Sequence, residues 1–337
     1  MNYFSGVLED SRSEAERKKD WFGEEVMSSA VRWKEKENLR SYPIWSQGSS
    51  GACVAFTFAK LVAIEFERKT GTWVDFSPSF IYLLRENATK PGMNVHNAAN
   101  LVKDHGTTLE AILNSQNMTE EEINALDINQ TAFDMAEAIS KVINSYLYLK
   151  PKADSVARAL HKGHGVGMIL YANRDEYGDV PIVKDEGLKY AEADIRHMIT
   201  LVDFYKDPDL GKCFRAEDSW GLGHGEGGRR VITENFLEKR SVGLVYLDKF
   251  EFVPYHESEY EFDENLQFGD QGEEVEKLQN FLKDRGYFPI DQESTGYYYT
   301  ITAKAVLEWQ IDNDVDDVET LKELRGHHFG PKSREHV

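Results

Sequence analysis

The densest run of apolar residues lies between positions 52 and 66, in the stretch WSQGSSGACVAFTFAKLVAIEFER that spans Trp45–Arg68. Charged residues interrupt this run only at Lys60 and Glu65. Small residues occupy positions 48–52 just before it, and such residues favour a tight turn. The pattern therefore predicts a turn that leads into a buried helix beginning near Cys53.

Helical signals also dominate the rest of the first half. Ser77 and Pro78 form a helix-entry pair. The segment VHNAANLVKDHG predicts a short helix that stops at Gly106. The segment 119–148 opens with a capping box, Thr119 followed by Glu122, and its apolar residues recur at helical spacing. We therefore read this region as mostly helical.

The pattern changes near residue 166 to short segments rich in β-branched and aromatic residues, separated by turns. These segments predict five strands, at Val166–Ala172, His197–Phe204, Lys212–Asp218, Gly228–Thr233 and Val242–Phe250. A helical lobe followed by a strand-rich lobe is an α+β, two-lobed architecture, and the cleft between the lobes is the natural place for a site.

A separate helical pattern follows an acidic stretch that begins at His256. Its three apolar stripes predict three short helices that close a small core of their own. The expected organisation is a tail or peripheral helix at 1–24, an α+β domain at 25–255, an acidic linker at 256–263 and a small all-α domain at 264–337.

Composition narrows the possible partners. The 337 residues carry a formal net charge of −20, which disfavours nucleic acid as a partner. We find no apolar run long enough for a membrane span and no signal-peptide pattern at the N-terminus. We therefore expect synthesis in the cytoplasm, with release or incorporation into a virion as possible fates. The two cysteines argue against a disulfide framework.

Cys53 is the candidate nucleophile. At a turn-to-helix junction, its sulfur meets unpaired N–H groups and the positive end of the helix dipole, which favours the reactive thiolate. Gln47, six residues upstream, could place its amide beside that sulfur and hold a developing oxyanion together with the Cys53 N–H. The alternative is a small, buried core cysteine.

Three segments in order then suggest a family. QGSSGACVAF, IRHMITLVDF and FRAEDSWGLGHGEGGRRVI resemble the nucleophile, histidine and third-residue segments of papain-like cysteine peptidases, and His197 follows Cys53 by 144 residues. The resemblance covers most of residues 25–255. It implies a papain-like fold and a cysteine endopeptidase that forms an acyl-enzyme intermediate.

The resemblance also implies roles for single residues. His197 would be the base that takes the thiol proton, and Asp218 would orient it where the family has an asparagine. Trp220 would cover the His197–Asp218 bond and border the substrate site; alternatively, it is an ordinary core tryptophan. We expect no metal or other cofactor, because the histidine pairs lack ligand spacing.

Substrate binding differs from the family pattern in several places. Gly92 is what remains of the glycine pair that lines the family's main side-chain pocket, and Arg196 adds a positive charge near it. We therefore expect an acidic or small substrate side chain. The stretch before Trp33 is shorter than the family's inhibitory propeptide, so we do not expect control by zymogen cleavage.

The C-terminal domain has a resemblance of its own. FGDQGEEVEKLQNFLKDRGYF, TGYYYTITAKAVLEWQIDNDV and the closing HHFGPKSR look like the three-helix peptidoglycan-binding domain of many wall hydrolases. Such modules also bind other glycans or proteins. The leading expectation is a peptidase directed to the cell wall, with a peptide or protein substrate. An acyl transferase or amidase that uses the same triad, and a structural or binding role in a particle such as a phage virion, remain open.

Overall fold

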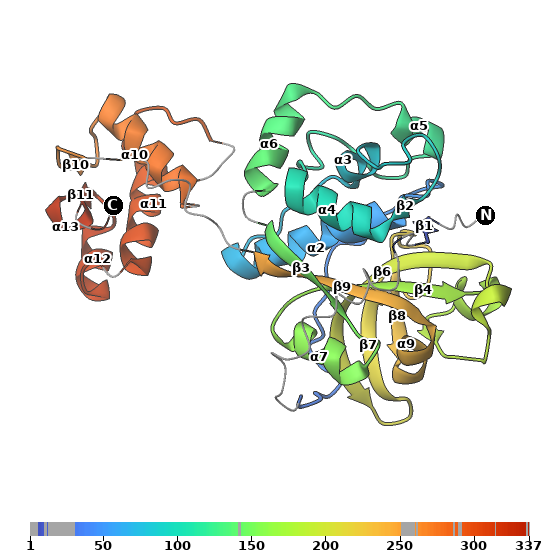
Figure 1. Cartoon of the computed structure of the whole chain (residues 1–337). Coiled ribbons are helices and arrows are strands. Elements are labelled where there is room, and N and C mark those ends of the chain that lie inside the picture. Colours follow the sequence, from blue (N-terminus) through green and yellow to red (C-terminus); the bar gives the residue numbers. More distant parts are fainter. Residues whose placement is uncertain are drawn as a thin grey trace. The chain divides into compact units, whose positions relative to one another are not determined.

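The computed structural model describes residues 6–9, 12, 31–140, 143–250, 260, 262–285, 287–288, 292–313, 315–334 and 336. The chain forms two compact units, Met1–Glu251 and Phe252–Val337 (Figure 1). Most of the expected N-terminal tail and of the acidic linker lies outside the described residues. No helix among those residues is both long enough and apolar enough to cross a lipid bilayer.

The predicted central helix is present and begins at the predicted residue. It is α2, Cys53–Thr70, and it ends where Gly71 adopts a left-handed φ of 72°. Residues 53–65 of this helix are all buried, so it is enclosed on every side over most of its length. Around it lie the other helices of the helical lobe, which are α3 (Pro78–Leu83), α4 (Val95–His105), α5 (Glu120–Asn124) and α6 (Gln130–Ser140) (Figure 1).

The second lobe is built on a seven-stranded sheet with the order β3-β9-β4-β6-β7-β8-β5. Its strands are β3 (Ile143–Leu149), β4 (Val166–Ala172), β5 (Ile182–Val183), β6 (Ile195–Asp207), β7 (Gly211–Glu217), β8 (Arg229–Thr233) and β9 (Ser241–Phe250). All five predicted strands are present. Helices α7 (Ala153–His161) and α9 (Glu234–Arg240) pack against this lobe (Figure 1). The mixed α+β class is confirmed.

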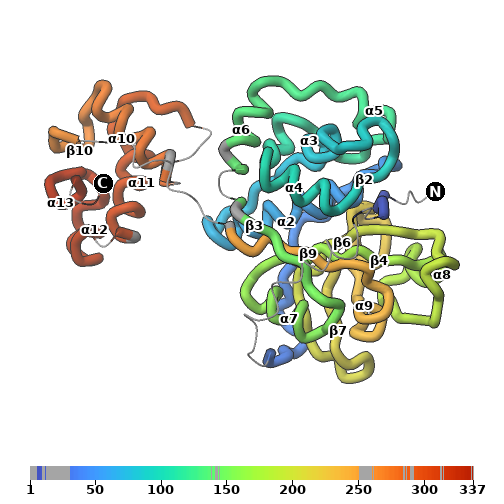
Figure 2. The backbone as a smooth tube through the Cα atoms, viewed as in Figure 1, coloured from blue at the N-terminus to red at the C-terminus, as the bar shows by residue number. Residues whose placement is uncertain are grey.

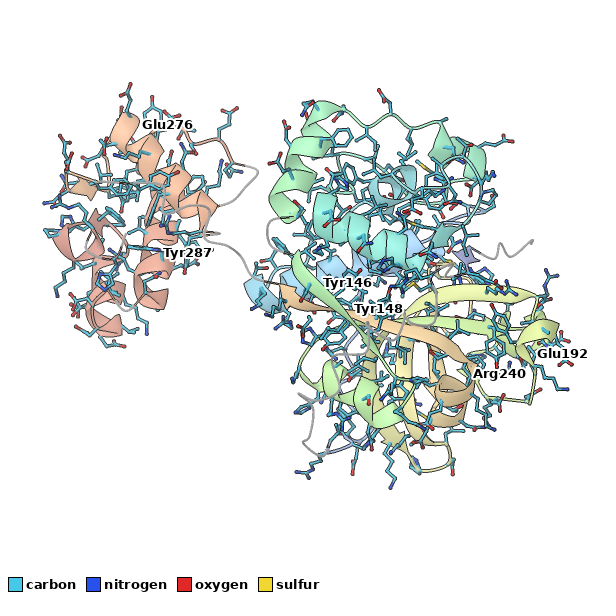
Figure 3. All side chains as sticks on the ribbon, viewed as in Figure 1. Tyr146, Tyr148, Glu192, Arg240, Glu276 and Tyr287 are labelled. Carbon is cyan, nitrogen blue, oxygen red and sulfur yellow. The ribbon has the colours of Figure 1, made fainter. Side chains whose placement is uncertain are left out.

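The helical reading of residues 119–148 is wrong at its C-terminal end, where β3 begins. The sequence INSYLYL alternates there, and Tyr146 and Tyr148 lie together on the strand, with ring centroids 5.9 Å apart (Figure 3). That two-residue period is the strand signal, and the helical spacing of the preceding α6 obscured it.

The two charged residues that interrupt the apolar run of α2 both have buried partners. Lys60 Nζ lies 2.9 Å from Glu217 Oε2 at the end of β7, and both side chains are buried. Glu65 Oε1 lies 2.8 Å from Nδ1 of His164, which precedes β4. A buried charge is tolerated when it is paired in this way. These contacts hold α2 in place against the sheet that carries the rest of the site.

The C-terminal unit contains the three predicted helices, α10 (Glu273–Asp284), α11 (Thr300–Asp312) and α12 (Val318–Leu324) (Figure 2). Their core includes Leu278, Phe281, Trp309 and Phe329. Phe262 is also buried in this core, so the expected linker at 256–263 ends inside the C-terminal unit. An aromatic side chain at that position buries apolar surface, which a solvated linker does not.

Candidate active site

Cys53 is the first residue of α2 and is completely buried. The turn of small residues brings it to the helix start, as the sequence predicts. The N-cap residue of α2, Ala52, makes no side-chain cap hydrogen bond to the backbone N–H groups of the first turn. The positive end of the helix dipole lies there as well.

His197 lies on β6, opposite Leu170 of β4, and is also completely buried. Its Nε2 donates a 2.7 Å hydrogen bond to Oδ1 of Asp218. Its Nδ1 is buried without a hydrogen bond of ordinary geometry. Burial lowers the pKa of His197, but the charge and hydrogen bond of Asp218, together with the nearby Cys53 thiol, outweigh it and raise the pKa to about 9. The Asp218 carboxylate therefore favours the imidazolium form of His197.

Asp218 follows β7 and is held by more partners than the sequence suggested. Its Oδ2 accepts hydrogen bonds from the hydroxyl of Tyr177 and from Nε of Arg230, each 2.9 Å long. Burial tends to raise the pKa of this carboxyl, but His197 and Arg230 hold it well below its usual range. Asp218 is therefore a carboxylate at neutral pH.

Arg230 is the part of the site that sequence reasoning missed. Its buried guanidinium donates to the backbone carbonyls of Tyr177, Gly178 and Val180 at 2.6–2.7 Å, in addition to Asp218. The sequence predicts only a strand at Gly228–Thr233. A signal was present, because an arginine that points inward from a strand requires a buried acid. Arg230 fixes the carboxylate that in turn holds His197.

Trp220 lies over the imidazole of His197. The two ring centroids are 4.6 Å apart with an interplanar angle of 30°, and Tyr177 meets the indole edge-on at 5.4 Å. An aromatic cover of this kind keeps water away from the polar groups beneath it. The structure thus brings Trp220, His197 and Asp218 together.

Gln47 is buried and joins the Cys53 turn to the Asp218 segment. Its Nε2 donates to the Ser50 carbonyl at 2.6 Å, and its Oε1 accepts from Oγ of Ser219 at 2.7 Å. Its backbone N–H donates to the Ser219 carbonyl at 2.8 Å. These bonds fix the Gln47 amide in the turn that precedes Cys53.

Residues 6–9 lie against the candidate nucleophile, so they are not the tail or peripheral helix that their composition predicts. A methyl group placed on Gly6 would come within 2.8 Å of Cys53 Sγ and would also meet the Gly51 carbonyl oxygen. Next, β1 (Val7–Leu8) pairs in parallel with β2 (Met93–Asn94), and Met93 N donates to the Gly6 carbonyl at 2.7 Å.

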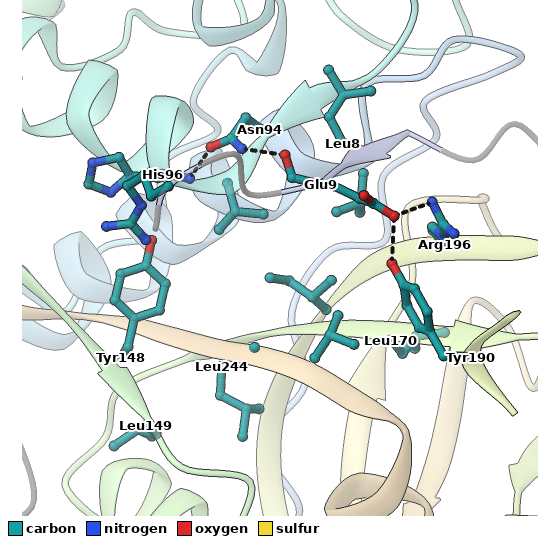
Figure 4. Close-up of a pocket in the computed structure, with 16 residues that line it drawn as sticks. Leu8, Glu9, Asn94, His96, Tyr148, Leu149, Leu170, Tyr190, Arg196 and Leu244 are labelled. Atoms are coloured by element: carbon teal, nitrogen blue, oxygen red, sulfur yellow. Dashed lines mark hydrogen bonds and ion pairs between the residues drawn. The ribbon is translucent and has the colours of Figure 1, made fainter. Parts of the chain in front are cut away.

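Gly92 and Arg196 both lie along this N-terminal segment. A Cβ on Gly92 would lie 3.0 Å from the Gly6 carbonyl oxygen and 3.1 Å from Leu8 Cδ2. Arg196 Nη1 lies 3.1 Å from Oε1 of Glu9. A pocket of about 480 Å³ adjoins the segment, and its wall includes Leu149, Ile169, Leu170 and Leu244 (Figure 4).

Cys213 has a different environment from Cys53. It is buried within β7, and burial, together with the charge of Asp207, raises the pKa of its thiol to about 11. A thiol with a raised pKa is a poor nucleophile at neutral pH. Across the described residues, no cluster of three histidine, cysteine or acidic side chains is arranged to hold a metal ion.

Comparison with solved structures identifies the fold of the first unit. Xylellain, a cysteine protease from Xylella fastidiosa, aligns over 73% of this chain and 96% of its own, with a TM-score of 0.61 and 13% identity. The digestive procathepsin L 3 of Tenebrio molitor aligns over 65% of this chain and 70% of its own, with a TM-score of 0.52 and 15% identity. The first unit has the papain-like fold. At these identities the likeness defines the fold alone.

The C-terminal unit matches a sequence family. Residues 271–317 match the family described as "Putative peptidoglycan binding domain". The match includes α10 and α11 of that unit. No curated protein sequence matches the chain. The chain thus joins a papain-like unit to a peptidoglycan-binding-type domain.

The contact between Gly6 and Cys53 gives a direct prediction. Gly6→Ala is expected to push the segment off Cys53, because overpacking by a methyl group costs about 1–3 kcal/mol. The rate of Cys53 alkylation by iodoacetamide, followed by mass spectrometry, should rise roughly tenfold or more. Gly223→Ala is the control, since a Cβ there meets nothing within 4 Å. Equal rates in Gly6→Ala and the unmodified chain would contradict the contact.

Proposed function

We propose that this chain is a cysteine endopeptidase that acts through Cys53, His197 and Asp218 and is directed to the bacterial cell wall by its C-terminal domain. The observation that carries the proposal is that these three side chains are buried next to one another in the papain-like unit. A cysteine at a helix start lies beside a histidine whose far nitrogen is held by a carboxylate. This is the arrangement that thiol-based acyl transfer requires.

In the proposed reaction, His197 Nδ1 holds the proton of the Cys53 thiol, and the thiolate attacks the peptide carbonyl. The carbonyl becomes an oxyanion, which the Cys53 N–H and the Gln47 amide would stabilise. The C–N bond then breaks as His197 gives its proton to the leaving amine. Water, deprotonated by His197, attacks the acyl-cysteine, releases the acid and restores the thiol.

The surrounding residues support this chemistry by electrostatics and by exclusion of water. The negative charge of Asp218 stabilises the imidazolium of the ion pair, and Arg230 and Tyr177 keep that carboxylate ionised and in place. Trp220 covers the His197–Asp218 bond and would border the bound substrate. Gly92 lies against the N-terminal segment that covers Cys53, and in the proposal it lines the path of the substrate backbone.

Wall binding is proposed for the C-terminal unit from its family match and from its surface. Phe268, Tyr297 and Tyr299 are exposed large aromatic side chains. The rings of Tyr297 and Tyr299 lie 6.0 Å apart and nearly parallel, at 9°. Exposed aromatic groups that cluster on a surface are typical of interaction sites, and flat rings suit the faces of sugars.

One comparison tests the proposed activity. The purified chain is incubated with casein and with wall sacculi, each with and without prior alkylation by iodoacetamide. We expect release of peptides from at least one substrate, and loss of that release in the alkylated sample. Turnover that survives complete alkylation of Cys53, or no turnover on either substrate, would overturn the proposal.

Wall binding gives a separate prediction. A fragment from Tyr260 to Val337, which retains Phe262, is expected to fold alone and to pellet with sacculi, because its core is its own. Replacing both Tyr297 and Tyr299 by alanine should weaken pelleting, whereas Leu324→Ala, an exposed apolar control on α12, should not. The chain is acidic, so added salt should not weaken binding as it does for a cationic protein. If the fragment never co-sediments, the partner is not the wall.

A further inference from the structure

We propose that Arg196 and Tyr190 form a subsite for a carboxylate side chain of the substrate, and that Glu9 of the chain's own N-terminal segment occupies this subsite in the structure. The inference rests on the proposed peptidase function and names a substrate class for it: peptides with an acidic residue close to the cleaved bond.

Two donors from different elements converge on one oxygen of Glu9. Arg196 Nη1, from β6, lies 3.1 Å from Oε1, and the hydroxyl of Tyr190, from the 3-10 turn η2 (Tyr190–Glu192), donates to the same oxygen at 3.3 Å (Figure 4). Asn94 Nδ2 donates to the Glu9 backbone carbonyl at 3.1 Å. The side chain of Glu9 is therefore bound by Arg196 and Tyr190, and its backbone is bound by Asn94.

The guanidinium of Arg196 is held in place by aromatic rings. Its central carbon lies 4.7 Å from the centroid of the Tyr190 ring, and Tyr190 in turn packs edge-on against Tyr171 at 5.1 Å. Tyr171 pairs with Arg196 in the register of β4 and β6. A stacked guanidinium loses less side-chain freedom when it binds an anion, which makes this arginine suited to carboxylate recognition.

The distance between this subsite and the nucleophile fits one bound peptide. Gly6 lies against Cys53 Sγ, and Glu9 is three residues further along the same extended segment. An extended chain advances about 3.3 Å per residue, so the subsite lies roughly 10 Å of peptide away from the sulfur. The carboxylate recognised here would thus belong to a residue about three positions from the scissile bond.

The 480 Å³ pocket beside residues 7–9 limits how strongly this region can select an acidic side chain. Its wall carries Ile169, Leu170 and Leu244, so apolar contacts supply much of its surface and the charge of Arg196 lies near its rim. The Arg196 side chain is 36% exposed, and solvent screens an interaction at that exposure. We therefore expect a moderate preference for an acidic side chain, of roughly two- to fivefold in kcat/KM.

The preference is measured with matched fluorogenic peptides. A glutamate or a glutamine is placed at each of the four positions on either side of the cleaved bond, and the ratio of kcat/KM for each pair is determined. The full chain should favour glutamate at one position by roughly two- to fivefold. In Arg196→Gln the ratio should fall to about one, and in Arg196→Glu a lysine at that position should be favoured. Lys162→Gln, which removes a charge from the end of α7, should leave the ratio unchanged.

A second measurement does not depend on turnover. If Glu9 and Arg196 bind each other, Glu9→Gln and Arg196→Gln should each raise the rate of Cys53 alkylation by a similar factor, and the double variant should add nothing further. Additive effects would show that the two residues do not act as a pair.

The outcomes separate this inference from the proposed function. No cleavage of any peptide, with coupled alkylation rates, would overturn the peptidase proposal but keep the pairing of Glu9 and Arg196. Cleavage with the same glutamate-to-glutamine ratio in the full chain and in Arg196→Gln would overturn the carboxylate subsite and leave the peptidase proposal standing. In that case, the Glu9–Arg196 pair only anchors the N-terminal segment.

Discussion

Cys53→Ala is expected to abolish hydrolysis of casein or sacculi, whereas Cys213→Ala should keep near-normal activity. Removing the nucleophile of a catalytic triad costs up to about a millionfold in kcat, because the remaining groups have no covalent step to assist. The two cysteines make a matched pair, since both are buried and free. They differ in that only Cys53 lies at a helix start near a histidine, while burial raises the pKa of Cys213.

Two controls keep this result interpretable. Thermal unfolding of both variants should show a similar Tm, which excludes loss of fold as the cause of lost activity. Cys53→Ser should also be strongly impaired, because a hydroxyl is not ionised by the same histidine at neutral pH. Residual activity of Cys53→Ala near that of the unmodified chain would remove the peptidase proposal altogether.

The second large effect is expected for Asp218→Ala, which should lower both the activity and the stability of the protein. Asp218→Ala removes the group that orients His197, at a cost of roughly tenfold to a thousandfold in kcat/KM. It also leaves the guanidinium of Arg230 buried without its carboxylate. Breaking a buried ion pair from one side destabilises a protein by about 3–5 kcal/mol. Both activity and the free energy of unfolding should fall.

Asp218→Asn separates the orientation of His197 from the negative charge beside it. The amide oxygen can still orient the imidazole, so activity should persist near neutral pH. Without the negative charge, however, the raised pKa of His197, about 9, should fall. The thiolate–imidazolium pair is lost as pH rises through that pKa, so the alkaline limb of the pH–rate profile should move to lower pH.

The raised pKa of His197 also has a consequence for stability. Because the pKa of His197 is higher in the folded than in the unfolded chain, its contribution to stability is complete below about pH 6.5 and is lost as pH rises through about 9.

Glu217→Gln is the matched control for Asp218→Asn. Glu217 is also a buried acid, but its partner is Lys60 and not His197. It should lower stability without moving the alkaline limb. An unchanged profile in Asp218→Asn would mean that another group sets the pKa of His197.

Local sequence signals accounted for much of this fold. The turn of small residues before an apolar run predicted where α2 begins, and short β-branched and aromatic segments bounded by turns predicted the five central strands of the β-rich lobe. Each signal lies within about ten residues, so it survives without knowledge of distant contacts. The strand β3 was missed because a helical period continues almost to its first residue.

The contacts around the candidate site were harder to foresee, because they join residues far apart in the chain. Arg230 reaches Asp218 across a glycine-rich loop, and Glu9 reaches Arg196 from the opposite end of the papain-like unit. Neither pair has a characteristic spacing in sequence. The charged composition of the N-terminal residues predicts a tail or a peripheral helix, yet Gly6 is the residue type that can approach a sulfur closely.

The strand at Val7–Leu8 also bears on how long the protein survives in an oxidising medium. A thiol paired with a histidine is readily converted to sulfenic and then to irreversible sulfinic acid. Peroxide cannot reach a sulfur with no exposed surface, so oxidation must wait for the strand to lift. In the proposed peptidase, the segment that keeps substrate away from Cys53 therefore also protects its thiol from oxidation.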